Sequence, residues 1–137
     1  DAVIHFRLYR HPSPSVPLEY YAPPFSYFKH ILEKLRPSHL WVVTEPRLRS
    51  HPTVLDLCAS PLNATLVSGA DAAADFRSLA SARGALLISH GTFSWMAAFL
   101  SQATTVHVPY FESGVFSNWA RQAFCVPEAG RPGHYIH

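Results

Sequence analysis

The chain has 137 residues, of which 48% are hydrophobic and 15% charged, and its formal net charge is +2. This length fits one globular domain that buries a core of its own, and the small, scattered positive charge argues against a nucleic-acid partner. No apolar run approaches the roughly 20 residues that span a bilayer, so a membrane anchor is expected only outside this chain.

The first half of the chain alternates between strand and helix patterns. Residues 2–6 are apolar and partly β-branched, which predicts a buried strand. After a proline-rich loop, large apolar residues recur at helical spacing over residues 25–35, and Pro37 ends that helix. Residues 39–44 predict a second strand, and a short helix is expected over residues 53–58.

The second half of the chain continues this alternation. Asp71 and Gly84 are typical of a helix cap and a helix stop. Three further strands are expected at residues 64–67, 85–89 and 104–108. Two helices are expected between them, at residues 71–83 and 93–101.

Continuous apolar strands that alternate with helices predict a doubly wound α/β fold, with a parallel sheet of about five strands covered on both faces. Right-handed crossovers place every strand-to-helix turn at one edge of such a sheet. Ligands bind along that edge, outside the carboxyl ends of the strands. The turns after the first and fourth strands carry the residues of interest.

The turn after the fourth strand has the features of an anion site. Gly91 lets the backbone approach a ligand, and Thr92 lies at or near the N-cap of the next helix. The first amides of a helix are unpaired and carry partial positive charge, which suits a phosphate group. The alternative is that Thr92 only caps its own helix.

The first strand ends with two side chains that suit the same ligand. His5 and Arg7 are two residues apart, so they point to the same side of the strand at its carboxyl end. Arginine can bind a phosphate with two hydrogen bonds. The alternative is an arginine that is solvated or paired with a surface carboxylate. Arg10 lies past the strand end and is expected to be solvated.

Taken together, these segments resemble one family. Residues 87–100, LISHGTFSWMAAFL, resemble the Ser-Thr-Phe-x-x-Trp-x-Ala-x-Leu segment of the α1,2-fucosyltransferases. His5-Phe6-Arg7 is similar to the His-x-Arg that opens the donor half in that family and in the α1,6- and protein-O-fucosyltransferases. Residues 18–21, LEYY, resemble a further family segment, so the likeness extends over about residues 1–111.

This resemblance implies the Rossmann-like, donor-binding half of a GT-B-type glycosyltransferase. Such an enzyme transfers fucose from GDP-fucose to a glycan acceptor with inversion, and it needs neither a metal nor a cofactor. An acceptor-binding half would precede residue 1, and the full-length enzyme would be a type II membrane protein facing the Golgi lumen.

The resemblance also implies roles for individual residues. Arg7 would bind the β-phosphate with His5 beside it, and Thr92 would complete the cradle with the amides of Gly91 and Phe93. Asp75 would face the guanine base. Arg7 would also be catalytic, and Glu45 is a candidate general base, with His11 as the other. The donor-binding sites are then His5, Arg7, Asp75, Gly91, Thr92 and Phe93.

The sequence departs from the family after His-x-Arg. Residues 8–10 read Leu-Tyr-Arg where the family has Arg-Gly-Asp, and Gly91 stands where the family has a serine. These changes leave a second possibility open, a non-catalytic nucleotide-sugar-binding or scaffolding domain derived from the same fold. The absence of an Asp-x-Asp pair agrees with a metal-independent site.

Three residues bear on the compartment. Cys58 and Cys125 either form a disulfide or are two buried thiols. Asn63 begins an N-glycosylation sequon, and we expect it on an exposed turn if the parent protein is a Golgi enzyme.

The ends of the chain suggest its organisation. It begins at Asp1 and its only methionine is Met96, so we expect a piece of a longer product. Residues 1–125 are expected to form the donor-binding domain. Residues 126–137, rich in Pro and Gly, are expected to form a C-terminal tail, and an amphipathic turn is predicted near residues 116–124.

Overall fold

Five parallel strands lie at the centre of the computed structural model, which describes residues 1–8, 22–69 and 71–109. The strands are β1 (Ala2–Phe6), β2 (Leu40–Thr44), β3 (Thr65–Val67), β4 (Ala85–Leu87) and β5 (Thr105–His107). The helices are α1 (Phe25–Leu35), α2 (Pro52–Cys58), α3 (Ala72–Ala80) and α4 (Thr92–Leu100), with a 3₁₀ turn η2 (Pro46–Leu48).

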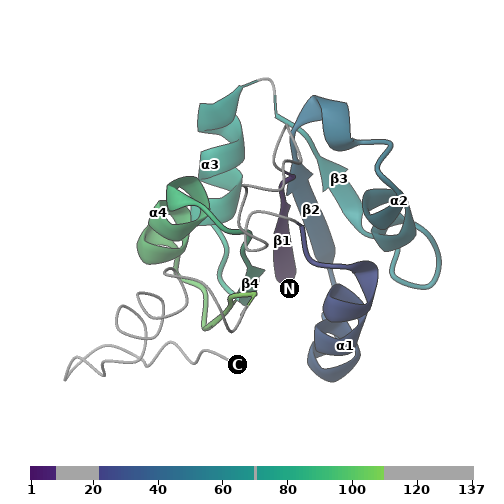
Figure 1. Cartoon of the computed structure of the whole chain (residues 1–137). Helices are drawn as coiled ribbons and strands as arrows, with labels where there is room; N and C mark the ends of the chain where they lie inside the picture. Colours follow the sequence, from purple (N-terminus) through teal and green to yellow (C-terminus); the bar gives the residue numbers. More distant parts are fainter. Residues whose placement is uncertain (9–21, 70, 110–137) are drawn as a thin grey trace.

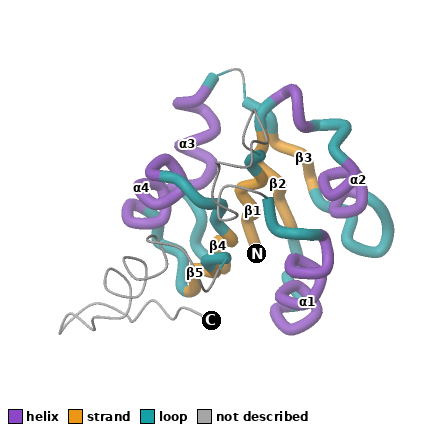
Figure 2. The backbone as a smooth tube through the Cα atoms, viewed as in Figure 1, coloured by secondary structure: helices purple, strands orange, loops and turns teal. Residues whose placement is uncertain are grey.

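The order of the strands across the sheet is β3-β2-β1-β4-β5, and every neighbouring pair is parallel. The predicted doubly wound α/β fold is therefore confirmed, and the sheet is Rossmann-like. In Figures 1 and 2, α1 and α2 lie on one side of the sheet and α3 and α4 on the other. The chain runs outward from β1 to β3 and then crosses back to β4, so the topological switch point lies between β1 and β4.

The two faces of β1 bury side chains into two separate cores. Ala2, Ile4 and Phe6 belong to a cluster that contains Phe28 of α1 and Leu57 of α2. The other face of β1 packs against α3 and α4, where Val3 shares a cluster with Leu79 and the fully buried Trp95. Because both faces of β1 are covered, the strand is apolar along nearly its whole length, as expected for a central parallel strand.

The structure corrects the end of one predicted helix. The helix that Asp71 caps ends at Ala80, and not at Arg83. Its last turn tightens because the Ala82 amide donates to the carbonyl of Leu79, and the buried Ala82 then leads the chain towards β4. Gly84 serves another purpose than a helix stop: a Cβ there would collide with the carbonyl oxygen of Asp1, the residue that precedes β1.

Asn63 lies in the turn between α2 and β3, with an exposed side chain and a left-handed backbone at φ 47°. The expected exposed position is therefore confirmed. Cys58, at the end of α2, is half-buried rather than buried, and desolvation raises the pKa of its thiol.

Several predictions lie outside the described residues. They concern His11, Arg10, Cys125, the segment at residues 18–21, the turn near residues 116–124 and the tail at residues 126–137. Within the ranges that are described, no helix is long and apolar enough to cross a membrane.

Candidate functional site

A cavity of about 480 Å³ lies at the carboxyl edge of the sheet, where β1, β2 and β3 end and α3 begins. It opens beside the switch point, the place where ligands of doubly wound sheets bind. Its volume falls within the range typical of small-molecule sites, about 300–1,000 Å³. The lining residues with a charged, titratable or aromatic side chain are His5, Arg7, Glu45, Arg47, Asp71, Asp75 and Phe93.

The turn after β4 leads into a helix end that no side chain caps. Gly91 is the N-cap of α4, and its φ of 121° is a conformation that other residues rarely adopt. Thr92 is the first helical residue and is exposed, so the structure excludes the interpretation that Thr92 caps its own helix. The first amides of α4 thus have no side-chain acceptor among the described residues.

Arg7 reaches the same turn from the end of β1. Its Nη1 atom lies 4.0 Å from the point where a Cβ on Gly91 would be. The guanidinium therefore faces the start of α4 across a residue that has no side chain. Gly91 and Thr92 do not line the cavity themselves, but Phe93, which follows them, does.

His5 shares the face of β1 with Arg7 but has a different environment. Its Nδ1 lies within hydrogen-bonding distance of two hydroxyl groups, those of Ser89 at 2.8 Å and Ser94 at 2.5 Å. Desolvation, with a smaller effect of the Arg7 cation, lowers the pKa of His5 to about 4. The imidazole is therefore neutral near pH 7, and it links β1 to the turn after β4 and to α4 rather than adding a positive charge beside Arg7.

Glu45, the predicted base, follows β2 and lies between two arginines. Its Oε1 is 3.7 Å from Nε of Arg7, and its Oε2 is 2.7 Å from Nε of Arg47. Arg47 also donates from Nη2 to the carbonyl of Leu8 at 2.8 Å. The structure thus pairs Glu45 with both guanidinium groups.

Sequence reasoning missed Arg47. The only local signal is its place two residues after Glu45, with Pro46 between them. Ser89 and Ser94 were missed as well, because their shared contact is a histidine 84 and 89 residues away along the chain.

The two aspartates at the start of α3 both accept backbone hydrogen bonds. Oδ1 of Asp71 accepts from the amide of Ala74 at 2.7 Å, which confirms the predicted cap. Oδ1 of Asp75 accepts from the amide of Gly69 at 2.7 Å, across the turn that follows β3. A Cβ on Gly69 would lie 2.5 Å from this same oxygen, so a side chain there would force Asp75 to move.

Phe93 forms the aromatic wall of the cavity. Its ring centroid lies 5.6 Å from that of His5 and 5.4 Å from that of Phe76, the second contact in an edge-on geometry. Asp75 and Phe93 therefore offer a carboxylate and an aromatic surface within one cavity.

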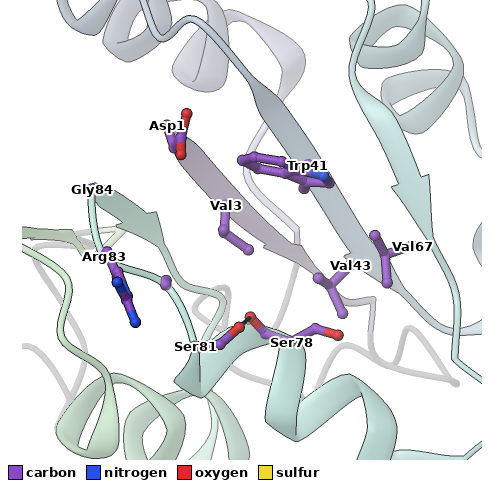
Figure 3. Close-up of a pocket in the computed structure, with 10 residues that line it drawn as sticks. Asp1, Val3, Trp41, Val43, Val67, Ser78, Ser81, Arg83 and Gly84 are labelled. Atoms are coloured by element: carbon purple, nitrogen blue, oxygen red, sulfur yellow. Dashed lines mark hydrogen bonds between the residues drawn. The ribbon is translucent and has the colours of Figure 1, made fainter.

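A second hollow, of about 310 Å³, lies on the face of the sheet beside α3 (Figure 3). Its polar lining consists of Asp1, Ser78, Ser81 and Arg83, and the hydroxyl groups of both serines donate to carbonyls of α3. Its floor consists of Val3, Trp41, Val43 and Val67. This hollow has an apolar floor and lies at the carboxyl end of α3, where the partial charge is negative, so we assign the candidate site to the cavity at the carboxyl edge.

Comparisons with protein-family models, with curated proteins and with solved structures each found no match. Over residues 1–8, 22–69 and 71–109, no three His, Cys, Asp or Glu side chains are grouped so as to hold a metal ion.

Proposed function

We propose that the cavity at the carboxyl edge, together with the adjacent start of α4, binds the diphosphate of GDP-fucose. The chain would then be the donor-binding half of an inverting, metal-independent glycosyltransferase that transfers fucose to a glycan acceptor. The observation that carries this proposal is the approach of Arg7 Nη1 to within 4.0 Å of the Cβ position of Gly91, at an uncapped helix end.

An anion fits this arrangement for electrostatic reasons. Arg7 presents a permanent positive charge and a planar fork of N–H donors. The amides at the start of α4 add donors and about half a unit of positive charge. Since Gly91 has no side chain, no side chain at that position separates the guanidinium of Arg7 from the amides of α4.

In this proposal Arg7 binds the β-phosphate. The rest of the diphosphate accepts hydrogen bonds from the Thr92 hydroxyl and from the amides of Gly91 and Phe93. The Gly69 amide holds Asp75 in place, and Asp75 accepts hydrogen bonds from the guanine edge. Phe93 forms the aromatic wall of the same cavity. During transfer, negative charge builds up on the departing diphosphate. Fixed donors aimed at that charge lower the barrier, and in this scheme Arg7 and the amides of α4 replace a metal ion.

A second candidate is a non-catalytic nucleotide-sugar-binding or scaffolding domain, and one observation favours it. Each carboxylate that lines the cavity already has a partner: Glu45 pairs with two arginines, Asp71 caps α3 and Asp75 accepts from Gly69. Release of fucose from GDP-fucose, followed by NMR, would support the enzyme. Binding of GDP-fucose without turnover, in a chain joined to its acceptor half, would support the second candidate.

Calorimetric titration with GDP tests the proposed site. We expect Arg7→Ala to weaken GDP binding about ten- to a hundredfold, because a charge-assisted hydrogen bond contributes about 1.5–3 kcal/mol. Arg7→Lys should restore only part of the affinity, since an ammonium group cannot form the paired contact of a guanidinium.

Arg49→Ala is the matched control. Arg49 is exposed like Arg7 and donates to the carbonyl of Ser68, but it does not line the cavity. Equal losses for Arg7→Ala and Arg49→Ala would overturn the proposed site, as would a wild-type chain that does not bind GDP.

A further inference from the structure

Two arginines, and not one, reach the cavity at the carboxyl edge. Arg7 comes from the end of β1 and Arg47 from η2, which follows β2. The side chains are 47% and 37% exposed, yet both are directed to the same carboxylate, that of Glu45. Arg47 is fixed at two points, by Glu45 Oε2 at 2.7 Å and by the carbonyl of Leu8 at 2.8 Å.

Glu45 allows the two guanidinium groups to lie close together. Like charges repel, and one carboxylate between them offsets that repulsion while leaving a net charge of one positive unit in the cluster. Each carboxylate oxygen faces one arginine, so Glu45 pairs with both cations at once.

The described contacts leave donors on both arginines. A guanidinium carries five N–H groups. Arg47 uses its Nε and one N–H of Nη2 for Glu45 and Leu8. Arg7 turns its Nε towards Glu45 and its Nη1 towards Gly91. Two sets of terminal N–H groups therefore remain for a ligand in the same cavity.

We infer that Arg7 and Arg47 form a two-point clamp for two linked phosphate groups, with Glu45 as the residue that positions them. Arg47 is then the specificity-determining residue that makes the site prefer a diphosphate to a monophosphate. This inference rests on the proposed function for the diphosphate as ligand class. It gives Glu45 a positioning role in place of the predicted role as general base.

The test compares inorganic pyrophosphate with inorganic phosphate, by calorimetry on the whole chain at fixed pH and salt. Wild type should prefer pyrophosphate about tenfold. Arg47→Ala should weaken pyrophosphate binding about tenfold and change phosphate binding less than twofold, so that the preference disappears. Arg7→Ala should weaken the binding of both ions. Arg49→Ala should change neither.

Glu45→Ala distinguishes a role of Glu45 in positioning the two arginines from its effect on the net charge of the cavity. Removing an acid makes the cavity more positive, so charge alone predicts tighter binding of both ions. The clamp predicts that the preference for pyrophosphate falls at least threefold, because the two guanidinium groups lose their common anchor. Unchanged preference in Glu45→Ala, or equal losses for both ions in Arg47→Ala, would overturn the clamp.

The same titrations with GDP and GMP distinguish the two proposals. A chain that prefers pyrophosphate through Arg47 but does not bind GDP would retain the clamp and overturn the nucleotide function. A chain that binds GDP with no contribution from Arg47 would retain the nucleotide function and overturn the clamp.

Discussion

At the scale of single residues, burial keeps His5 uncharged and so couples folding to pH. The folded protein holds the pKa of His5 at about 4, mainly by desolvation, whereas an unfolded histidine titrates near 6.5. Above pH 6.5 both states are neutral and His5 contributes no pH dependence. Between pH 6.5 and 4 only the unfolded state binds the proton, so stability falls as the pH falls.

Replacing His5 with Asn should flatten this dependence. From the two pKa values, wild type should lose about 2 kcal/mol at pH 5 relative to pH 7 through this one group. Urea denaturation of both proteins at the two pH values measures the difference. His90, whose pKa is also lowered by burial, titrates in both proteins and cancels. Identical losses in the two proteins would show that folding does not lower the pKa of His5.

The candidate site was predictable where the topology fixes it. Arg7 and Gly91 were predicted to meet because right-handed crossovers bring every strand-to-helix turn to one edge of the sheet, and they do lie together. The contacts of Arg47, Ser89 and Ser94 were not predictable, since they depend on side chains that approach from different elements. Glu45 was predicted as a base because a sequence shows a carboxylate but not the arginines that surround it.

At the scale of elements, the starts of α3 and α4 differ although both follow a strand of the same sheet. Asp71 caps α3 with its carboxylate, whereas α4 begins at a glycine without a side-chain cap. The carboxylate of Asp71 accepts from one of the first amides of α3, whereas the N-cap residue of α4 offers no such acceptor.

This difference predicts unequal costs for two alanine substitutions. Asp71→Ala should lower the free energy of unfolding by about 1 kcal/mol, because it removes the acceptor for the Ala74 amide. Thr92→Ala should change it by less than about 0.5 kcal/mol, because Thr92 is exposed and does not cap α4. Thermal or urea unfolding measures both. A loss for Thr92→Ala as large as that for Asp71→Ala would place the cap at Thr92.

Element order and type were predictable, since short apolar runs and helical periodicity mark them clearly. The residues at which the elements end were less predictable. The strands β3, β4 and β5 are shorter than their apolar runs, and α3 ends three residues early. These ends depend on tertiary contacts, such as the close approach of Gly84 to Asp1, that no local pattern encodes.

At the scale of the whole molecule, the two edges of the sheet have different features. The cavity with Arg7 and Arg47 lies at the carboxyl edge. Asn63 precedes β3 and so lies at the amino edge. A glycan on Asn63 would therefore project away from the proposed site.

Expression through a secretory pathway tests the compartment that the resemblance implies. We expect Asn63 to carry an N-glycan, because the side chains of both Asn63 and Thr65 are exposed. Mass spectrometry before and after enzymatic removal of N-glycans measures this, with Asn63→Gln as the control. Glycosylated and unglycosylated chains should bind GDP equally. If Asn63 carries no glycan in this experiment, the sequon gives no support for a lumenal protein.

The position of β1 has a consequence for synthesis on the ribosome. β1 is made first, and its partner β2 follows within about forty residues, but its other partner is β4 at Ala85–Leu87. Until β4 emerges, a nascent chain that has already formed β1, β2 and β3 exposes an unpaired, apolar strand edge. Such edges are templates for association with other chains, and parallel pairings between distant segments form slowly. The strand that carries His5 thus gains its second neighbour only when β4 pairs with it, and the proposed phosphate site, which includes the turn after β4, cannot form earlier.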